Sequence, residues 1–186
     1  MPKIIDETKI FSAAIDILMS LGYDKATTKD IADIAGVNEV TIFRKFGSKA
    51  GLFEKAIEHQ LSDTPLDKVA YTGELEADLL GIVNAYLETN ERYGNIIAII
   101  LLELPRNPDL RGSINTPWSN LQGIIKVLQK YQKEGLLKDE APLTTISALL
   151  GPIMVHQMFR RAALDLPVPV IDSAAHVASF LHGKKV

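Results

Sequence analysis

A chain of 186 residues, 47% of them hydrophobic, is long enough to bury a core and too apolar for a disordered protein. It contains no cysteine, which excludes disulfide bonds, thiol catalysis and zinc sites with cysteine ligands. The net charge of −3 does not by itself indicate a nucleic-acid-binding protein, so a DNA-binding surface would depend on the local placement of positive charge.

The hydrophobic pattern predicts helices along the whole chain and no alternation long enough for a strand. A first helix is expected at residues 6–21, two short helices follow within residues 27–46, and a fourth helix ends near residue 61. Residues 65–73 form the expected domain boundary. The remaining helices are expected at residues 74–92, 96–104, 113–133, 142–164 and 170–181.

The sequence also bears on location. The first residues do not have the pattern of a signal peptide, and the longest apolar run, Ile96–Leu102, is too short to span a bilayer. We therefore expect a cytoplasmic protein with no membrane partner.

Residues 27–53 have the pattern of a helix-turn-helix, followed by the start of a further helix. Thr28 is expected to cap the first short helix, Gly36 to adopt the left-handed conformation in the turn, and Asn38 to cap the second short helix. This motif places its second helix in the major groove of DNA. Positive charge gathers in or beside it, where phosphates would lie, at Lys29, Arg44, Lys45 and Lys49.

The first quarter of the chain resembles the N-terminal DNA-binding domain of the TetR family of transcriptional regulators. The resemblance covers about residues 8–56 and is carried by Ile10, Ala13–Ala14, Gly22–Tyr23, Thr27–Thr28, Ile31–Ala32, Ala35–Gly36–Val37, Thr41, Phe43, Phe46, Ser48–Lys49 and Leu52–Phe53. Its most specific part is the run from Phe46 to Phe53, directly after the helix-turn-helix. The rest of the chain is similar to the family only in length and helical character.

The resemblance implies an all-α subunit of about nine helices that forms a homodimer. Residues 1–47 would be the DNA-binding domain, residues 48–64 a linking helix, and residues 65–186 a larger effector-binding and dimerisation domain. It implies a repressor that occupies a palindromic operator in double-stranded DNA and is released by a small-molecule effector. The alternative is a member of the same fold without an effector, which binds DNA constitutively or recruits another protein.

Position along the second short helix, Glu39–Phe46, indicates which residues face the bases. Glu39, Val40 and Arg44 are expected there, and a glutamate can accept a hydrogen bond from the amino group of cytosine. The other interpretation of Glu39 is a favourable charge at a helix N-terminus. By resemblance, positions that contact the DNA backbone are Thr28, Thr41, Phe43, Lys45 and Lys49. Lys29 could reach a base or a phosphate, or be simply solvated, and Asn38 completes the predicted surface.

The second part of the chain carries aromatic and aliphatic residues that could line an effector pocket, or simply form the core. The predicted lining is Tyr86, Asn90, Tyr93, Ile97, Trp118, Leu121, Met154 and Met158. Few charges fall inside these helices, so a mainly apolar effector is expected.

The last two helices are expected to form the dimer interface as a four-helix bundle with their mates. The predicted faces are Ile146, Leu149, Leu150, Ile153 and Gln157 on one helix and Ala174, Val177, Ala178 and Leu181 on the other. Small residues allow such helices to approach closely. The same faces could instead pack within one subunit.

A catalytic function is not expected. The four histidines, His59, His156, His176 and His182, do not have the spacing of a metal site. The chain also lacks a glycine-rich phosphate loop and a G-x-S-x-G motif. No cofactor and no metal are predicted.

Overall fold

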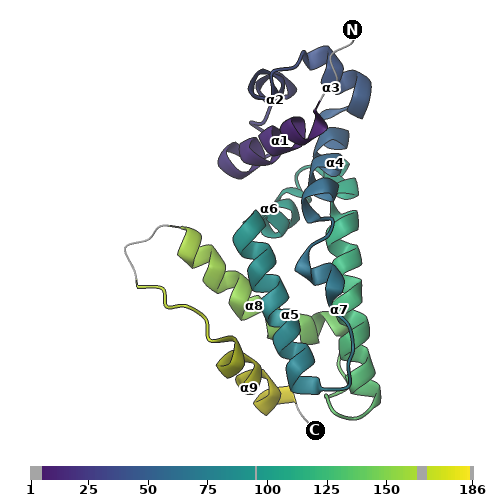
Figure 1. Cartoon of the computed structure of the whole chain (residues 1–186), viewed down its shortest axis with the longest axis vertical. Coiled ribbons are helices and arrows are strands. Elements are labelled where there is room, and N and C mark those ends of the chain that lie inside the picture. The colour runs from purple at the N-terminus through teal and green to yellow at the C-terminus, as the bar shows by residue number, and fades with distance from the viewer. Residues whose placement is uncertain (1–5, 95, 163–166, 185–186) are drawn as a thin grey trace. The chain divides into compact units, whose positions relative to one another are not determined.

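The computed structural model describes residues 6–94, 96–162 and 167–184. This part of the chain is helical and has no β-strand, which confirms the predicted all-α class (Figure 1). Its α-helices are α1 (Glu7–Leu21), α2 (Thr28–Ala35), α3 (Glu39–Phe46), α4 (Lys49–Leu61), α5 (Leu75–Tyr93), α6 (Ile96–Glu103), α7 (Asn115–Lys133), α8 (Pro142–Arg161) and α9 (Ser173–Lys184). Two 3-10 helices, η1 (Pro65–Lys68) and η2 (Pro108–Ile114), lie between them.

The described residues fall into two compact units. The first comprises residues 6–62 and 96–118, and the second comprises residues 63–94, 119–162 and 167–184. The grouping differs from a single division at residue 65, because α6 and η2 belong to the first unit. The reason is packing: η2 packs against α4, and α6 packs against η2.

Side-chain caps begin all four N-terminal helices of the first unit. Asp6 accepts from the N–H of Thr8 at the start of α1, and Ser48 accepts from the N–H of Gly51 at the start of α4. Asn38 caps α3, as predicted. The cap of α2 is Thr27, whose hydroxyl oxygen accepts from the N–H of Asp30, and not the predicted Thr28. Thr28 is instead the first residue of the helix.

Two glycines set the connections around α3. Gly36, between α2 and α3, has φ 67° and ψ 35°, the left-handed conformation that was predicted and that glycine adopts at least cost. Gly51 lies where α4 passes the end of α3. A Cβ atom at residue 51 would lie 2.3 Å from the carbonyl oxygen of Phe46, so only glycine permits this approach. The relative placement of α3 and α4 therefore depends on a residue without a side chain.

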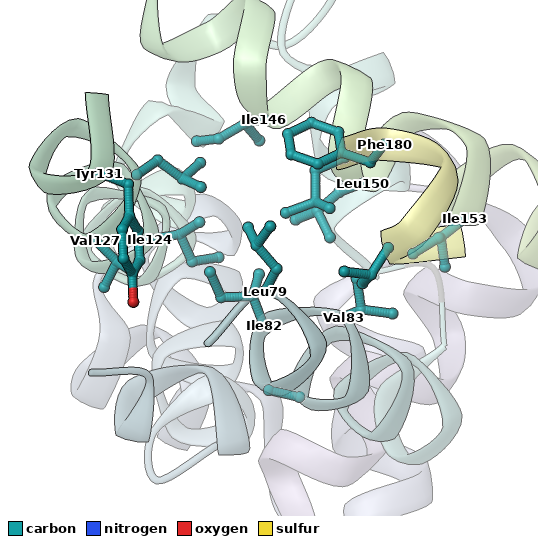
Figure 2. Close-up of a cluster of buried hydrophobic side chains, with 14 of the residues drawn as sticks. Leu79, Ile82, Val83, Ile124, Val127, Tyr131, Ile146, Leu150, Ile153 and Phe180 are labelled. Carbon is teal, nitrogen blue, oxygen red and sulfur yellow. The ribbon is translucent and has the colours of Figure 1, made fainter. Parts of the chain in front are cut away.

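The second unit is built around aliphatic side chains from α5, α7, α8 and α9. Figure 2 shows Leu79, Ile82 and Val83 of α5 facing residues of α7 and α8, with Phe180 of α9 beside them. Burial of such residues is the main favourable term in folding. The fully or almost fully buried members include Leu79, Ile82, Val83, Leu128, Tyr131, Leu137, Leu149 and Ile153.

One buried acid lies at the edge of this core. The carboxylate of Asp78 accepts hydrogen bonds from the N–H of Thr72 at 2.8 Å, the hydroxyl of Thr72 at 2.6 Å and the phenol of Tyr131. Burial raises the pKa of the Asp78 carboxyl, but the hydrogen bonds from Thr72 and Tyr131 outweigh burial and hold this pKa below its usual value. The charge is thus accommodated inside the unit.

The C-terminal helices differ from their predicted bounds. Helix α8 ends at Arg161, and the predicted end at residue 164 lies outside the described residues. Helix α9 begins at Ser173 and not at Val170, because Asp172 accepts from the N–H of Ala175 and Val170 is 81% exposed. It continues to Lys184, whose ammonium group pairs with Glu140 at 2.6 Å.

Most of the residues predicted at a dimer interface are buried inside the subunit. Each of the six is at most 7% exposed: Ile146, Leu149, Leu150, Ile153, Gln157 and Val177. They pack within one subunit, which was the alternative, so their side chains are not available to a partner. Ala174 and Ala178 are exposed and Leu181 is half-buried.

Candidate nucleic-acid interface

Helix α3 has one buried anchor and an exposed outer face. Ile42 is fully buried against the first unit, whereas Val40 is 70% exposed, Phe43 is 48% exposed and Arg44 is exposed. The helix is only eight residues long, and Ile42 is its one buried residue. Its outer face is therefore free to meet another molecule.

The exposed apolar residues of α3 suit contact with DNA. Isolated exposed apolar side chains are common on proteins, but Val40 and Phe43 lie on one short helix that follows a tight turn. Apolar side chains in the major groove contact the methyl group of thymine. Phe46, in contrast, is half-buried and its ring meets that of Phe11 of α1 in a tilted contact with ring centroids 5.7 Å apart.

A hydrogen bond joins two of the predicted DNA-binding residues to each other. The hydroxyl of Thr28 donates to Oε1 of Glu39 at 2.6 Å. Thr28 is only 8% exposed, and Glu39 is half-buried. The side chain of Asn38 is committed to the N–H of Val40 at 2.8 Å, and Thr41 is half-buried.

Two of the predicted lysines have partners within the first unit. Lys45 forms an ion pair with Glu7 of α1. Lys49 lies over the ring of Tyr23, 4.1 Å from its centroid, and the Tyr23 hydroxyl donates to Asp109 of η2 at 3.0 Å. Sequence reasoning missed Glu7, Tyr23 and Asp109, since they come from distant parts of the chain.

Burial changes the pKa values of both Lys49 and Tyr23. It lowers the pKa of the Lys49 ammonium group, while the carboxylates of Asp24, Asp109 and Glu103 act in the opposite direction. Burial, with the hydrogen bond to Asp109, raises the pKa of the Tyr23 phenol. Tyr23 therefore stays neutral and donates its proton to Asp109.

Among the four predicted cations, Lys29 and Arg44 differ from the other two, which have partners within the first unit. Both are exposed, and within the described part of the chain neither forms an ion pair. The surface of α2 and α3 thus combines two available cations, two exposed apolar side chains and one carboxylate. Cations bind phosphates, and apolar and acceptor groups discriminate between base edges.

The residues predicted to line an effector pocket are divided between the two units. Ile97 and Trp118 belong to the first unit, and the other six belong to the second. Trp118 is 45% exposed and Met158 is 40% exposed, whereas Asn90 is buried and donates to the carbonyl of Gly94 at 3.2 Å. Burial raises the pKa of Tyr86 to about 12. Their role in effector binding stays a prediction.

The second unit does contain a cleft with a different lining. It has a volume of about 480 Å³ and is lined by Leu87, Glu91, Gln157, Arg160, Arg161, Val170 and Ile171. Arg161 donates to the backbone carbonyl of Asn90 at 2.6 Å. The lining is more polar than the predicted pocket and includes none of the eight predicted residues.

A helix that spans a membrane must be both long and apolar. Among the described residues, no helix combines the length and the apolar character that crossing a bilayer requires.

The capped turn of α2 and α3 and the exposed face of α3 define a helix-turn-helix protein of the DNA-binding class. Residues 10–56 match the family model described as bacterial regulatory proteins, tetR family. The HTH-type transcriptional regulator YvkB of Bacillus subtilis, itself uncharacterised, is 33% identical over 131 residues, which are 70% of this chain and 69% of YvkB. The chain belongs to the TetR family of transcriptional regulators, which are not enzymes.

Two further similarities extend over most of the chain. The uncharacterised HTH-type transcriptional regulator Mb1581 of Mycobacterium bovis is 28% identical over 167 residues, or 90% of this chain and 81% of that protein. The crystal structure of a transcriptional regulator from Rhodococcus has a TM-score of 0.73 at 17% identity and covers 97% of this chain and 98% of its own. The second unit therefore shares the fold of such regulators although it carries no sequence motif.

Proposed function

We propose that this TetR-family regulator is a cytoplasmic repressor that binds a palindromic operator as a homodimer and is released by a small effector. The observation that carries the proposal is the outer face of α3, where Val40, Phe43 and Arg44 are exposed while Ile42 is fully buried. A dimer is part of the proposal because one helix-turn-helix contacts few base pairs, and two half-sites together give the discrimination of an operator.

The proposed dimer surface is the exposed side of α8 and α9. On α8, Val155 and Phe159 are four residues apart and therefore share one face, and they are 48% and 50% exposed. On α9, Ala174 and Ala178 are exposed, and such small side chains allow close helix packing. Exposed apolar residues along one helix are typical of a surface that a second subunit covers.

The proposed effector site is the cleft in the second unit. Its volume of about 480 Å³ is in the range of small-molecule sites. Leu87, Val170 and Ile171 offer an apolar wall, and Arg160 and Arg161 bring two guanidinium groups. Glu91 and Gln157 complete the lining, which supports an effector with an apolar part and polar groups, among them an acidic group for the guanidinium of Arg160.

Selection of bound duplexes from fragmented DNA of the source organism tests the operator. At near-physiological salt, we expect recovery of a short inverted repeat, with the protein eluting as a dimer. The genes beside that repeat would then suggest the chemistry of the effector. A folded dimer that recovers no sequence in the absence of added ligand would contradict the proposal that it binds an operator.

The two neighbouring cations of α3 provide a sharper test. Arg44→Ala should weaken operator binding by about 5- to 50-fold, because Arg44 is exposed and has no ion-pair partner in the described residues. Lys45→Ala is the matched control, and it should cost less than about threefold because Glu7 already neutralises Lys45. Fluorescence anisotropy with the selected duplex measures both. Equal effects, or a larger one for Lys45→Ala, would mean that α3 lies differently on DNA.

A further inference from the structure

The contact between Thr28 and Glu39 points to a role in sequence recognition. We propose that Thr28 is a positioning residue: it holds the Glu39 carboxylate in one conformation so that Glu39 accepts a hydrogen bond from a base amino group. The proposal rests on the operator binding proposed above. It gives Thr28 a different role from the phosphate contact that resemblance to the family implies.

The geometry of this contact is that of a strong hydrogen bond. The Thr28 hydroxyl, at the first turn of α2, donates to Oε1 of Glu39, at the first turn of α3, over 2.6 Å. A hydroxyl that donates to a carboxylate forms a charge-assisted bond, which is stronger than a neutral one. Thr28 is 8% exposed, so water competes poorly for its proton.

Neither residue is needed to cap a helix. Thr27 caps α2 by accepting from the N–H of Asp30 at 3.0 Å, and Asn38 caps α3 by accepting from the N–H of Val40 at 2.8 Å. The bond between Thr28 and Glu39 is therefore additional to the capping of the helix-turn-helix. It fixes a side chain relative to the turn.

The number of protons limits what Thr28 can do. A threonine hydroxyl has one proton, and here the proton is donated to Glu39. While this bond exists, Thr28 cannot also donate to a phosphate oxygen. Its effect on DNA must then pass through Glu39.

A fixed carboxylate reads a base edge selectively. A free glutamate loses side-chain freedom when it meets a base, whereas a glutamate that is held in advance loses less. A carboxylate only accepts hydrogen bonds, so in the major groove it is matched by the amino groups of cytosine and adenine and repelled by the carbonyl oxygens of guanine and thymine. We therefore expect cytosine or adenine at the position that Glu39 faces in each half-site.

The test compares operator preferences of the full-length protein and its variants, by sequencing selected duplexes at one salt concentration. The wild type should prefer an amino base by about tenfold at one symmetric pair of positions. Thr28→Val should reduce that preference to about threefold or less, leave the other positions unchanged, and add nothing in a Glu39→Ala background. Thr28→Ser, which keeps the hydroxyl, should retain the preference.

The opposite pattern would overturn the inference. If Thr28 contacts a phosphate, Thr28→Val will weaken binding to all sequences alike and will add to the effect of Glu39→Ala. Should Thr28→Val unfold because a methyl group replaces the buried hydroxyl, Thr28→Ala removes the same hydroxyl and leaves only the Cβ, and it must lose the same preference. A wild type that selects no sequence overturns operator binding itself, whereas a wild type with an unaltered Thr28→Val profile overturns only the role of Thr28.

Discussion

The short helices of the helix-turn-helix and the long helices α5 and α8 of the second unit are stabilised in different ways. In the first unit, α1 to α4 each begin at a side chain that accepts a hydrogen bond from the first turn. In the second unit, the shorter helix α9 is capped by Asp172, which accepts from the N–H of Ala175. The long helices α5 and α8, in contrast, begin at Glu74 and Ala141 without a side-chain cap bond. These helices have 19 and 20 residues and bury a broad apolar stripe, whereas α2 and α3 have eight residues each.

The difference follows from what each region must leave exposed. A short helix is unstable alone, because forming its first turn is costly and few residues repay the cost. Helix α3 buries only Ile42, since its outer face stays free. Local capping therefore supports short helices such as α2 and α3 that bury few residues, whereas burial along a long stripe suffices for α5 and α8.

The strongest test of this comparison is a cavity in the core of the second unit. Leu149→Ala should lower the free energy of unfolding by about 2–5 kcal/mol, because Leu149 is fully buried. The control Leu136→Ala removes a side chain that is 39% exposed and should cost less than about 1 kcal/mol. Urea unfolding followed by circular dichroism measures both. If Leu149→Ala instead leaves the unfolding free energy unchanged and dissociates the dimer, Leu149 must lie at the subunit interface and not in the core.

Replacing one glycine in each unit by alanine should change the stability of the protein in opposite directions. Gly51→Ala would place its Cβ 2.3 Å from the Phe46 carbonyl oxygen, and the required shift should cost about 1–3 kcal/mol and weaken DNA binding. At Gly81 in α5, an added Cβ meets nothing within 4 Å, so Gly81→Ala should stabilise by about 0.5–1 kcal/mol. Thermal unfolding and anisotropy report the two quantities. A stable, fully active Gly51→Ala protein would show that α3 and α4 can separate.

The smallest expected effect concerns the caps themselves. Asn38→Ala removes the acceptor of the Val40 N–H and should cost about 1 kcal/mol of unfolding free energy in the absence of DNA. Glu74→Ala, at the N-cap of α5, removes no cap bond and should stay within about 0.5 kcal/mol of the wild type. Similar losses in both variants would argue that the two regions do not differ in how their helices begin.

The features that could be predicted from the sequence are those that depend on near neighbours. The cap Asn38 and the left-handed Gly36 lie within a few residues of the groups they serve, and the structure confirms them. Thr27 and Thr28 are adjacent and chemically alike, so the pattern could not choose between them. The hydroxyl of Thr28 instead donates to Glu39, which is 11 residues away and meets it only in the folded unit.

Two features could not be predicted from the sequence. One is the set of ion pairs and hydrogen bonds between residues far apart in the chain, and the other is which subunit covers an apolar helix face. Lys45 and Glu7 are 38 residues apart, and Tyr23 and Asp109 are 86 apart, so no local pattern relates them. The periodicity of α8 showed that Leu149 and Ile153 belong to a buried face. Periodicity cannot tell whether that face is covered by the same subunit or by another, and here it is the same subunit.

The close approach at Gly51 has a mechanical consequence. Because the backbone of α4 at Gly51 rests against the last carbonyl of α3, we expect a change in the direction of α4 to move α3 with it. The Tyr23–Asp109 hydrogen bond joins η2 to the segment between α1 and α2, and η2 also packs against α4. If an effector releases the protein from its operator as we propose, a displacement of residues 96–118 would be passed through α4 to α3, and the effector would not need to contact α3 itself.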